Sequence, residues 1–460
     1  MSQQDEGLEG KLNMAKSWKI EGGFNEVVSS YASINSKVSP EVLERRKKLF
    51  ANLNESLMVP DQKYQLDYAR ENAEDLMIFE SGGTFGFFVN NFLDIIYADA
   101  VSAELREKGK KSLNFIIIDP TDVSRFERTI QYAGKKVKMP LPEESAESWR
   151  STQSIASPTK LDLTSFFDTV EKETEIYFEE IWRLNHGFKR EVELGKNLIE
   201  AREKSKLNLA KLKERTYGFA EQSKSYREFT DKLLIELISP LIRNSIFVTL
   251  NQWQSAWNIA EQFKDSKIYG DIDRVTAKIT ANEEESKRPK PLKRETGNYS
   301  FPFRIDNKEA IFHSPVANLK DGKVYMNEKE IGAPGSLNSP IADLFTPNFN
   351  LIPQGGILYA LDALAYDAIP LVPSESRVIV GHELASEKTK TKPFLAQYEI
   401  PFFSLARRTK SSPDTKKSGA ISAYLEGLDA DFVKKTFAKR DKIEFSVASD
   451  IYTKYGQPLY

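Results

Sequence analysis

The segment LAKLKERTYGFAEQSKSYREFTDKLLIELI, residues 209–238, carries the strongest pattern in this 460-residue chain. Apolar or small uncharged residues recur at steps of three and four, and the residues between them are mostly charged or polar. This spacing is that of a heptad seam. It predicts a single helix from about Leu198 to Ile238, roughly 60 Å long at 1.5 Å per residue.

The seam is interrupted by Thr216, Ser223 and Thr230, where a self-sufficient zipper would more often have leucine. The sequence therefore favours packing against a second helix of the same chain, within Leu161–Glu193, over a coiled coil between chains. Ser239-Pro240 is expected to begin a third helix, Leu241–Phe263. The predicted helix-packing or oligomer residues are Leu209, Leu212, Phe219, Tyr226, Leu233, Leu237, Trp253 and Trp257.

The region before this segment reads as mixed α/β. Ser39-Pro40 is a helix start, with Ser39 as N-cap and proline in the first turn. Leu113–Ile118 is a buried strand closed by Asp119-Pro120. Arg125–Met139 is expected to form a hairpin around residues 133–136.

The glycine-rich stretch Ser81–Gly86 leads into the apolar stretch Phe87–Leu105. A phosphate cradle or a membrane-inserting segment competes here with a turn followed by a core helix. No Gly-Lys-Ser/Thr follows, and no strand is evident before the glycines. The apolar stretch is also short and interrupted by acidic residues, which favours the core helix.

The C-terminal part is predicted to be β-rich. Strict alternation at Tyr299, Phe301, Phe303 and Ile305 indicates a half-buried strand, and a further strand is expected at Ile443–Val447. A basic cluster is the best candidate for contact with an anion. Its residues are Lys388, Lys390, Lys392, Arg407, Arg408 and Lys410.

These features predict an α+β multidomain protein with a long antiparallel helical hairpin or coiled-coil rod at its centre. The expected domains are a mixed α/β region at 1–160, the helical segment at 161–281, a charged proline-containing linker at 282–298 and a β-rich domain at 299–460.

Composition excludes several kinds of chemistry. The chain has no cysteine, so disulfides, thiolate zinc sites and cysteine nucleophiles are absent. Its three histidines are scattered, which argues against a histidine zinc centre and leaves a Ser-His-Asp relay only as a weak alternative. We therefore predict no catalytic, cofactor-binding or metal-ligating residue. With 65 basic and 67 acidic residues, nucleic acid is not expected as the main partner.

The sequence favours a non-enzymatic structural or assembly subunit of a large complex, such as a virus particle or a secretion or injection machine. Its expected partners are copies of itself or other protein subunits. The first alternative is a membrane-active helical protein, either a pore former or a lipid-surface scaffold, and the second is a hydrolase of unidentified type. Residues 1–10 lack the apolar core of a Sec signal, so synthesis in the cytoplasm followed by incorporation into a particle fits the assembly prediction.

Overall fold

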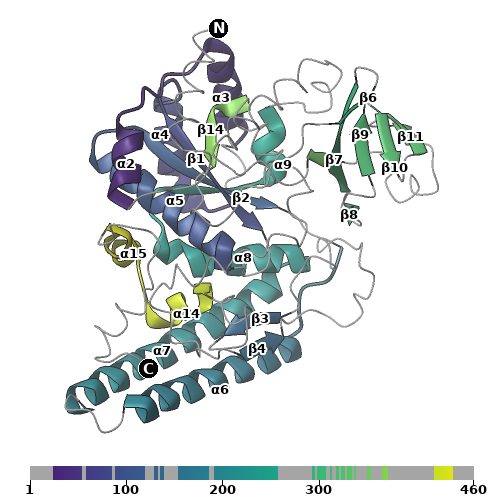
Figure 1. The fold of residues 1–460 in the computed structure, drawn as a ribbon. Helices are drawn as coiled ribbons and strands as arrows, with labels where there is room; N and C mark the ends of the chain where they lie inside the picture. Colours follow the sequence, from purple (N-terminus) through teal and green to yellow (C-terminus); the bar gives the residue numbers. More distant parts are fainter. Residues whose placement is uncertain are drawn as a thin grey trace.

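The computed structural model describes residues 24–53, 58–84, 89–119, 129–132, 135–138, 154–185, 191–256 and 419–438, with short segments between 293 and 370. Figure 1 shows the helices and strands of these residues. A four-stranded sheet lies at their centre, and helices cover both of its faces.

The central sheet is entirely parallel. Its strand order is β14-β1-β2-β5, with β14 at Ala368–Pro370, β1 at Met77–Thr84, β2 at Ser112–Asp119 and β5 at Ser245–Thr249. The side chains of β2 are buried from Ser112 to Ile118. Continuous burial of this kind is typical of a parallel strand that is covered on both faces.

One face of the sheet is covered by α5, Val89–Glu107, which connects β1 to β2 and packs on both strands. α2, Phe24–Ala32, and α15, Ala430–Ala438, pack against α5 in turn. Tyr97 of α5 meets Phe437 of α15 edge-on, with ring centroids 5.1 Å apart. β1, α5 and β2 thus form a βαβ unit, whose outer surface is closed by helices from both ends of the sequence.

The opposite face is covered by α3, Pro40–Asn52, and by α9, Leu250–Trp253. Phe50 of α3 stacks on Phe115 of β2 at a centroid distance of 5.9 Å. α4, Lys63–Glu71, packs beside β5. The remaining short helices are η2 at Pro60–Gln62, η3 at Ser239–Leu241 and η4 at Gln254–Ala256.

Three α-helices of the described residues lie between β2 and β5 in the sequence. α6, Lys160–Asn185, packs against α7, Glu191–Gln222, and α8, Tyr226–Ile238, packs into the main hydrophobic core together with α5. α14, Gly419–Glu426, packs on α7 and α8. The core is therefore continuous from the sheet into the base of these helices.

Two further sheets are antiparallel. β3, Thr129–Tyr132, pairs with β4, Lys135–Lys138, which confirms the predicted hairpin. The other sheet has the order β12-β11-β10-β9-β7-β13, and β6 and β8 also pair with β7. Its strands are β6 Lys293–Glu295, β7 Asn298–Asp306, β8 Ile311–Phe312, β9 Ala317–Lys320, β10 Lys323–Met326, β11 Lys329–Ala333, β12 Ser336–Leu337 and β13 Asn350–Pro353.

The predicted fold class is wrong. The centre of the described residues is an α/β core built on a parallel sheet, rather than a helical rod between two domains. β5 comes from the segment expected to be helical, and β14 comes from the segment expected to be a β-rich domain. Residues 419–438 of that predicted domain form α14 and α15, which pack on the α/β core. The long-range pairing of short strands outweighed the local helical pattern.

The predicted single helix from Leu198 to Ile238 is also wrong. α7 ends at Gln222, and Ser225 begins α8 as its N-cap, with its side-chain oxygen accepting a hydrogen bond from the Glu228 amide at 3.2 Å. Serine favours such a cap because its hydroxyl satisfies an N–H group that has no partner within the helix. Because the heptad spacing continues across the break between α7 and α8, the sequence pattern does not reveal this break.

Candidate functional sites

The carboxyl end of β1 is the first candidate site. β1 ends in Ser81-Gly82-Gly83-Thr84, and its register places Gly83 opposite Ile118 and Thr84 opposite Asp119 of β2. The two strands therefore end together at one edge of the sheet. The sequence interpretation that no strand precedes these glycines is wrong, because they are the last part of β1.

The strand order gives this edge a further property. From β1 the chain passes to β2 and then β5 on one side, whereas β14 pairs with β1 on the other side. The direction of the strand order thus reverses at β1. In open parallel sheets, ligands bind outside the carboxyl ends of the strands at such a reversal.

A buried ion pair between Arg227 and Asp231 lies at this edge. It is buried near the start of α8, donates from Nη2 to the Ile118 carbonyl oxygen at 3.4 Å and forms an ion pair with Asp231 at 2.7 Å. Burial raises the pKa of Asp231, and the charge of Arg227 opposes this rise. The guanidinium therefore lies one strand away from Gly83, which is the residue paired with Ile118.

Polar side chains also link the strands inside the sheet, away from this edge. Asn114 of β2 donates from Nδ2 to the hydroxyl oxygens of Ser81 on β1 at 3.1 Å and of Ser245 on β5 at 2.9 Å. Glu80 of β1 is only 1% exposed. Buried polar groups require partners, so these contacts fix the lateral positions of the three strands.

β14 forms the far side of the strand reversal, and two arginines of α3 hold the residues before it. Arg46, fully buried, donates from Nε to the Tyr366 carbonyl oxygen at 2.8 Å, and Arg45 donates from Nε to the Ala365 carbonyl oxygen at 2.7 Å. Burial lowers the pKa of Arg46 to about 10, and the nearby charge of Asp367 opposes this shift. A strand of 3 residues is thus fixed mainly by contacts outside its own ladder.

At the opposite, amino-terminal edge, Asp99 of α5 holds the start of β5. Its carboxylate accepts hydrogen bonds from the Asn244 amide at 2.7 Å, the Arg243 amide at 3.0 Å and the Ser245 hydroxyl at 2.6 Å. Burial raises the pKa of Asp99 to about 6, against the effect of these donors. Because all three donors belong to the turn into β5, this cluster serves to position the strand.

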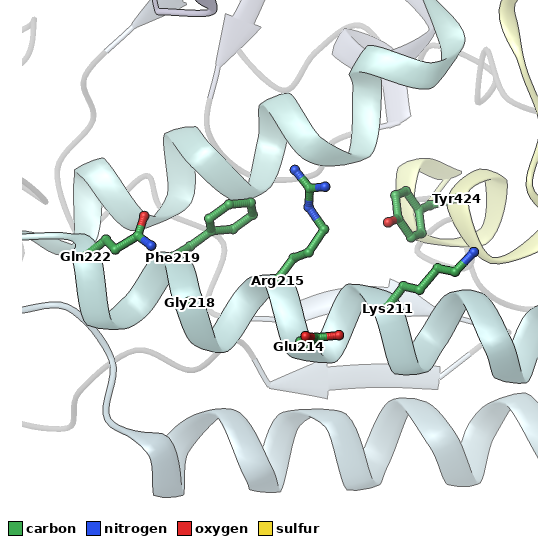
Figure 2. Close-up of a pocket in the computed structure, with 7 residues that line it drawn as sticks. All are labelled: Lys211, Glu214, Arg215, Gly218, Phe219, Gln222 and Tyr424. Carbon is green, nitrogen blue, oxygen red and sulfur yellow. The ribbon is translucent and has the colours of Figure 1, made fainter.

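The second candidate site is an open groove on α7, with a volume of about 520 Å³. Figure 2 shows its lining side chains on α7, with Tyr424 contributed by α14. The lining residues are Lys211, Glu214, Arg215, Gly218, Phe219, Gln222 and Tyr424. The groove therefore combines two aromatic rings with charges of both signs.

One wall of the groove is fixed by Glu236 of α8. Its carboxylate accepts a hydrogen bond from the Tyr424 hydroxyl at 2.9 Å and forms an ion pair with Arg215 at 2.7 Å. Burial, with the hydrogen bond to Glu236, raises the pKa of Tyr424 to about 12. Tyr424 therefore stays protonated at neutral pH, and α7, α8 and α14 are joined at this point.

The predicted helix-packing residues occupy different environments. Phe219 is partly buried at the groove, and Trp257 lies outside the described residues. The others are buried against neighbouring elements of the same chain: Leu209, Leu212, Tyr226, Leu233, Leu237 and Trp253. The predicted anion contacts, Lys388, Lys390, Lys392, Arg407, Arg408 and Lys410, all lie outside the described residues. The oligomer role predicted for the first set and the anion-binding role predicted for the second both stay predictions.

Sequence reasoning missed Arg227, Asp99 and the two arginines of α3. Arg227 resembles the other charged residues that flank the heptad seam, and no local pattern marks it as buried. Asp99 gives a weak signal, as a single acid within an apolar helix. Arg45 and Arg46 acquire their partners only through the return of the chain at residues 365–366, which no local pattern predicts.

Across the described ranges, no group of three or more His, Cys, Asp or Glu side chains could hold a metal ion. Among the helices of the same residues, none is long and apolar enough to cross a membrane. No known family model matches the chain, and no curated protein matches it.

Proposed function

We propose that the protein binds a nucleotide at the carboxyl edge of β1 and β2. The observation that carries this proposal is the βαβ unit itself: β1 ends in adjacent glycines, lies at the reversal of strand order and continues through α5 into a parallel β2. Sheets of this kind bind dinucleotides and mononucleotides at this position.

The glycine-rich sequence suits the phosphate groups. Near the end of β1, Gly82 and Gly83 present backbone without side chains at this edge, and α5 is the next helix; backbone N–H groups and the positive end of a helix favour an anion. The chain has no Gly-Lys-Ser/Thr after these glycines, so binding would resemble a dinucleotide fold more than a P-loop.

Asp119 suits the sugar. It is the last residue of β2 and lies in register with Thr84, the last residue of β1. An acidic residue near the end of the second strand of such a unit commonly accepts hydrogen bonds from ribose hydroxyls. We assign this role to Asp119.

The test is titration of the full chain with fluorescent adenine and guanine nucleotides, followed by calorimetry with the unlabelled compound. Asp119→Asn should weaken binding about tenfold or more, as loss of a charged hydrogen-bond acceptor does. Asp168→Asn, on the exposed face of α6, is the control and should bind as the parent does. The proposal would be overturned if no binding is seen at about 1 mM nucleotide. A dissociation constant above this value corresponds to a binding free energy weaker than about 4 kcal/mol.

The predicted role as an assembly subunit is the second candidate. It is favoured by large apolar side chains on the surface of α7, where Leu207 is 58% exposed and Ile199 is 64% exposed. Exposed apolar residues that gather on one element are typical of protein contact sites. Binding of a nucleotide and self-assembly are compatible, whereas the membrane-active and hydrolase alternatives stay predictions that no described residue tests.

A further inference from the structure

The outer face of α7 presents a regular row of residues. Leu207, Lys211, Glu214 and Gly218 follow at spacings of four, three and four, which places them along one side of the helix. Leu207, Lys211 and Glu214 are exposed, whereas Leu209 and Leu212 on the opposite side are buried. The row runs along the groove of Figure 2, whose lining includes its last three members.

We propose that two copies of this chain pair through the outer face of α7, with the two helices antiparallel. A twofold axis through the midpoint of residues 203–222 places Leu207 opposite Gly218 of the partner subunit. The same axis places Lys211 opposite Glu214 of the partner subunit. Each contact occurs twice, as a twofold interface requires.

Gly218 provides the space that the first contact needs. Apart from its chain neighbours and the backbone of α7 itself, no atom lies within 4 Å of the position that a Cβ would take at Gly218. A leucine side chain from a second helix can therefore approach the backbone of α7 closely at this point. Burial of Leu207 in this notch removes its exposed apolar surface from water, which favours association.

The second contact is one of charge. Within the described part of the chain, neither Lys211 nor Glu214 forms an ion pair. In the antiparallel arrangement each meets an opposite charge, and Glu203 faces the amide side chain of Gln222. A parallel pairing with the helices in register would instead place Lys211 beside Lys211 and Glu214 beside Glu214, where like charges repel. Charge complementarity thus selects a second copy in the antiparallel direction.

α14 marks one border of this interface. Asn208 donates to the carbonyl oxygens of Leu425 at 3.0 Å and Tyr424 at 3.3 Å, and Lys204 donates to the Gly427 carbonyl oxygen at 3.3 Å. These α7 residues are engaged within the chain, whereas Leu207, Lys211 and Glu214 of the row are exposed. The inference does not depend on nucleotide binding, but it specifies the contact that the proposed assembly role would use.

The absence of cysteine permits a direct test of the pairing. We expect a mixture of the Leu207→Cys and Gly218→Cys chains to give a disulfide-linked dimer under mild oxidation. Each variant alone should give little disulfide-linked dimer. Equal cross-linking of Leu207→Cys with itself would indicate a different arrangement and overturn the proposal.

A charge exchange tests the same interface without cross-linking. In sedimentation velocity, Lys211→Glu should weaken the dimer about tenfold, and the double variant Lys211→Glu with Glu214→Lys should restore it, because the exchanged charges meet again. Leu207→Asp should give monomers, whereas Leu161→Asp, at an exposed position of α6, should not. A dimer that survives Leu207→Asp would overturn this interface but not self-assembly. A parent chain that is monomeric at about 100 μM, a concentration well above a micromolar dissociation constant, would overturn both.

Discussion

At the scale of single residues, the fold depends on buried polar side chains that hold distant segments together. Asp99 fixes the turn into β5, Asn114 links β1 to β5, and Arg46 fixes the approach to β14. Each makes its contacts with backbone or hydroxyl groups rather than with an opposite charge. Since a buried polar group that loses its partner destabilises a protein strongly, these residues define the strand positions as well as stabilising them.

Asp99 should make stability depend on pH. Its folded-state pKa, about 6, is above the ordinary value of 3.8, so the folded state binds this proton more tightly. The resulting stabilisation is complete below about pH 4 and is lost as the pH rises through 6, about 3 kcal/mol in total. The free energy of unfolding of the parent minus that of Asp99→Asn should fall by this amount between about pH 3 and pH 8 in urea titrations. A difference that stays constant or grows with pH would contradict the assignment.

Two glycines with positive φ give a second prediction. Gly109, φ +79, and Gly427, φ +62, follow α5 and α14, where a left-handed residue ends each helix. A Cβ on Gly109 meets no atom within 4 Å, whereas one on Gly427 would lie 2.5 Å from Cε of Lys204. Gly109→Ala should therefore destabilise by about 1 kcal/mol through backbone strain alone.

Gly427→Ala should destabilise by about 2 kcal/mol, because Lys204 must also move and give up its hydrogen bond to the Gly427 carbonyl. Thermal unfolding of the two variants beside the parent measures the difference. Equal effects would show that the contact of Lys204 with α14 does not contribute.

At the scale of elements, the sequence predicted what local chemistry determines. The N-cap of α3 is confirmed, since the Ser39 side chain accepts a hydrogen bond from the Val42 amide, and β2 lies where its apolar run placed it. β5, Ser245–Thr249, was assigned to a helix because a strand buried on both faces shows no alternation. β14 could not be predicted, because a strand of 3 residues is specified by its tertiary contacts with β1 and with Arg45 and Arg46 of α3.

The candidate ligand site was half visible in the sequence. Its glycines stand out in the sequence, but no strand is evident before them. Both side chains are buried, and Ser81 is hydrogen-bonded to Asn114 of β2, a partner that becomes apparent only in the assembled sheet. The position of Arg227 beside β2 likewise depends on tertiary structure.

The anchoring of β14 can be tested at Arg46. This side chain donates to three carbonyl oxygens, those of Tyr366, Ala73 and Leu76, so Arg46→Leu should destabilise by roughly 3–5 kcal/mol. Lys47→Leu, at the next and exposed position of α3, should change stability by less than about 0.5 kcal/mol. Hydrogen exchange of the Ala368 and Ile369 amides should accelerate in the first variant only. Unchanged protection of these amides against exchange in Arg46→Leu would show that pairing with β1 is sufficient to hold β14 in place.

At the scale of the whole molecule, the parallel sheet gathers strands from residues 77–84, 112–119, 245–249 and 368–370. Helices from residues 24–32 and 419–438 then close one face of the same core. Elements that are remote in sequence therefore share one cooperative unit. Substitutions in α15 should for this reason affect the stability of α2 and α5, on which it packs.

This topology also constrains how the protein is made. On the ribosome, β1 and β2 emerge early, but the strand that covers the free edge of β1 is not available until residue 370 has been synthesised, and α15 follows only at residue 438. Until then the nascent chain exposes an unpaired strand edge and part of an apolar core, a state prone to aggregation. Completion of the fold is therefore delayed until most of the chain has left the exit tunnel, and its yield in a cell will depend on chaperones that shield the N-terminal half during this interval.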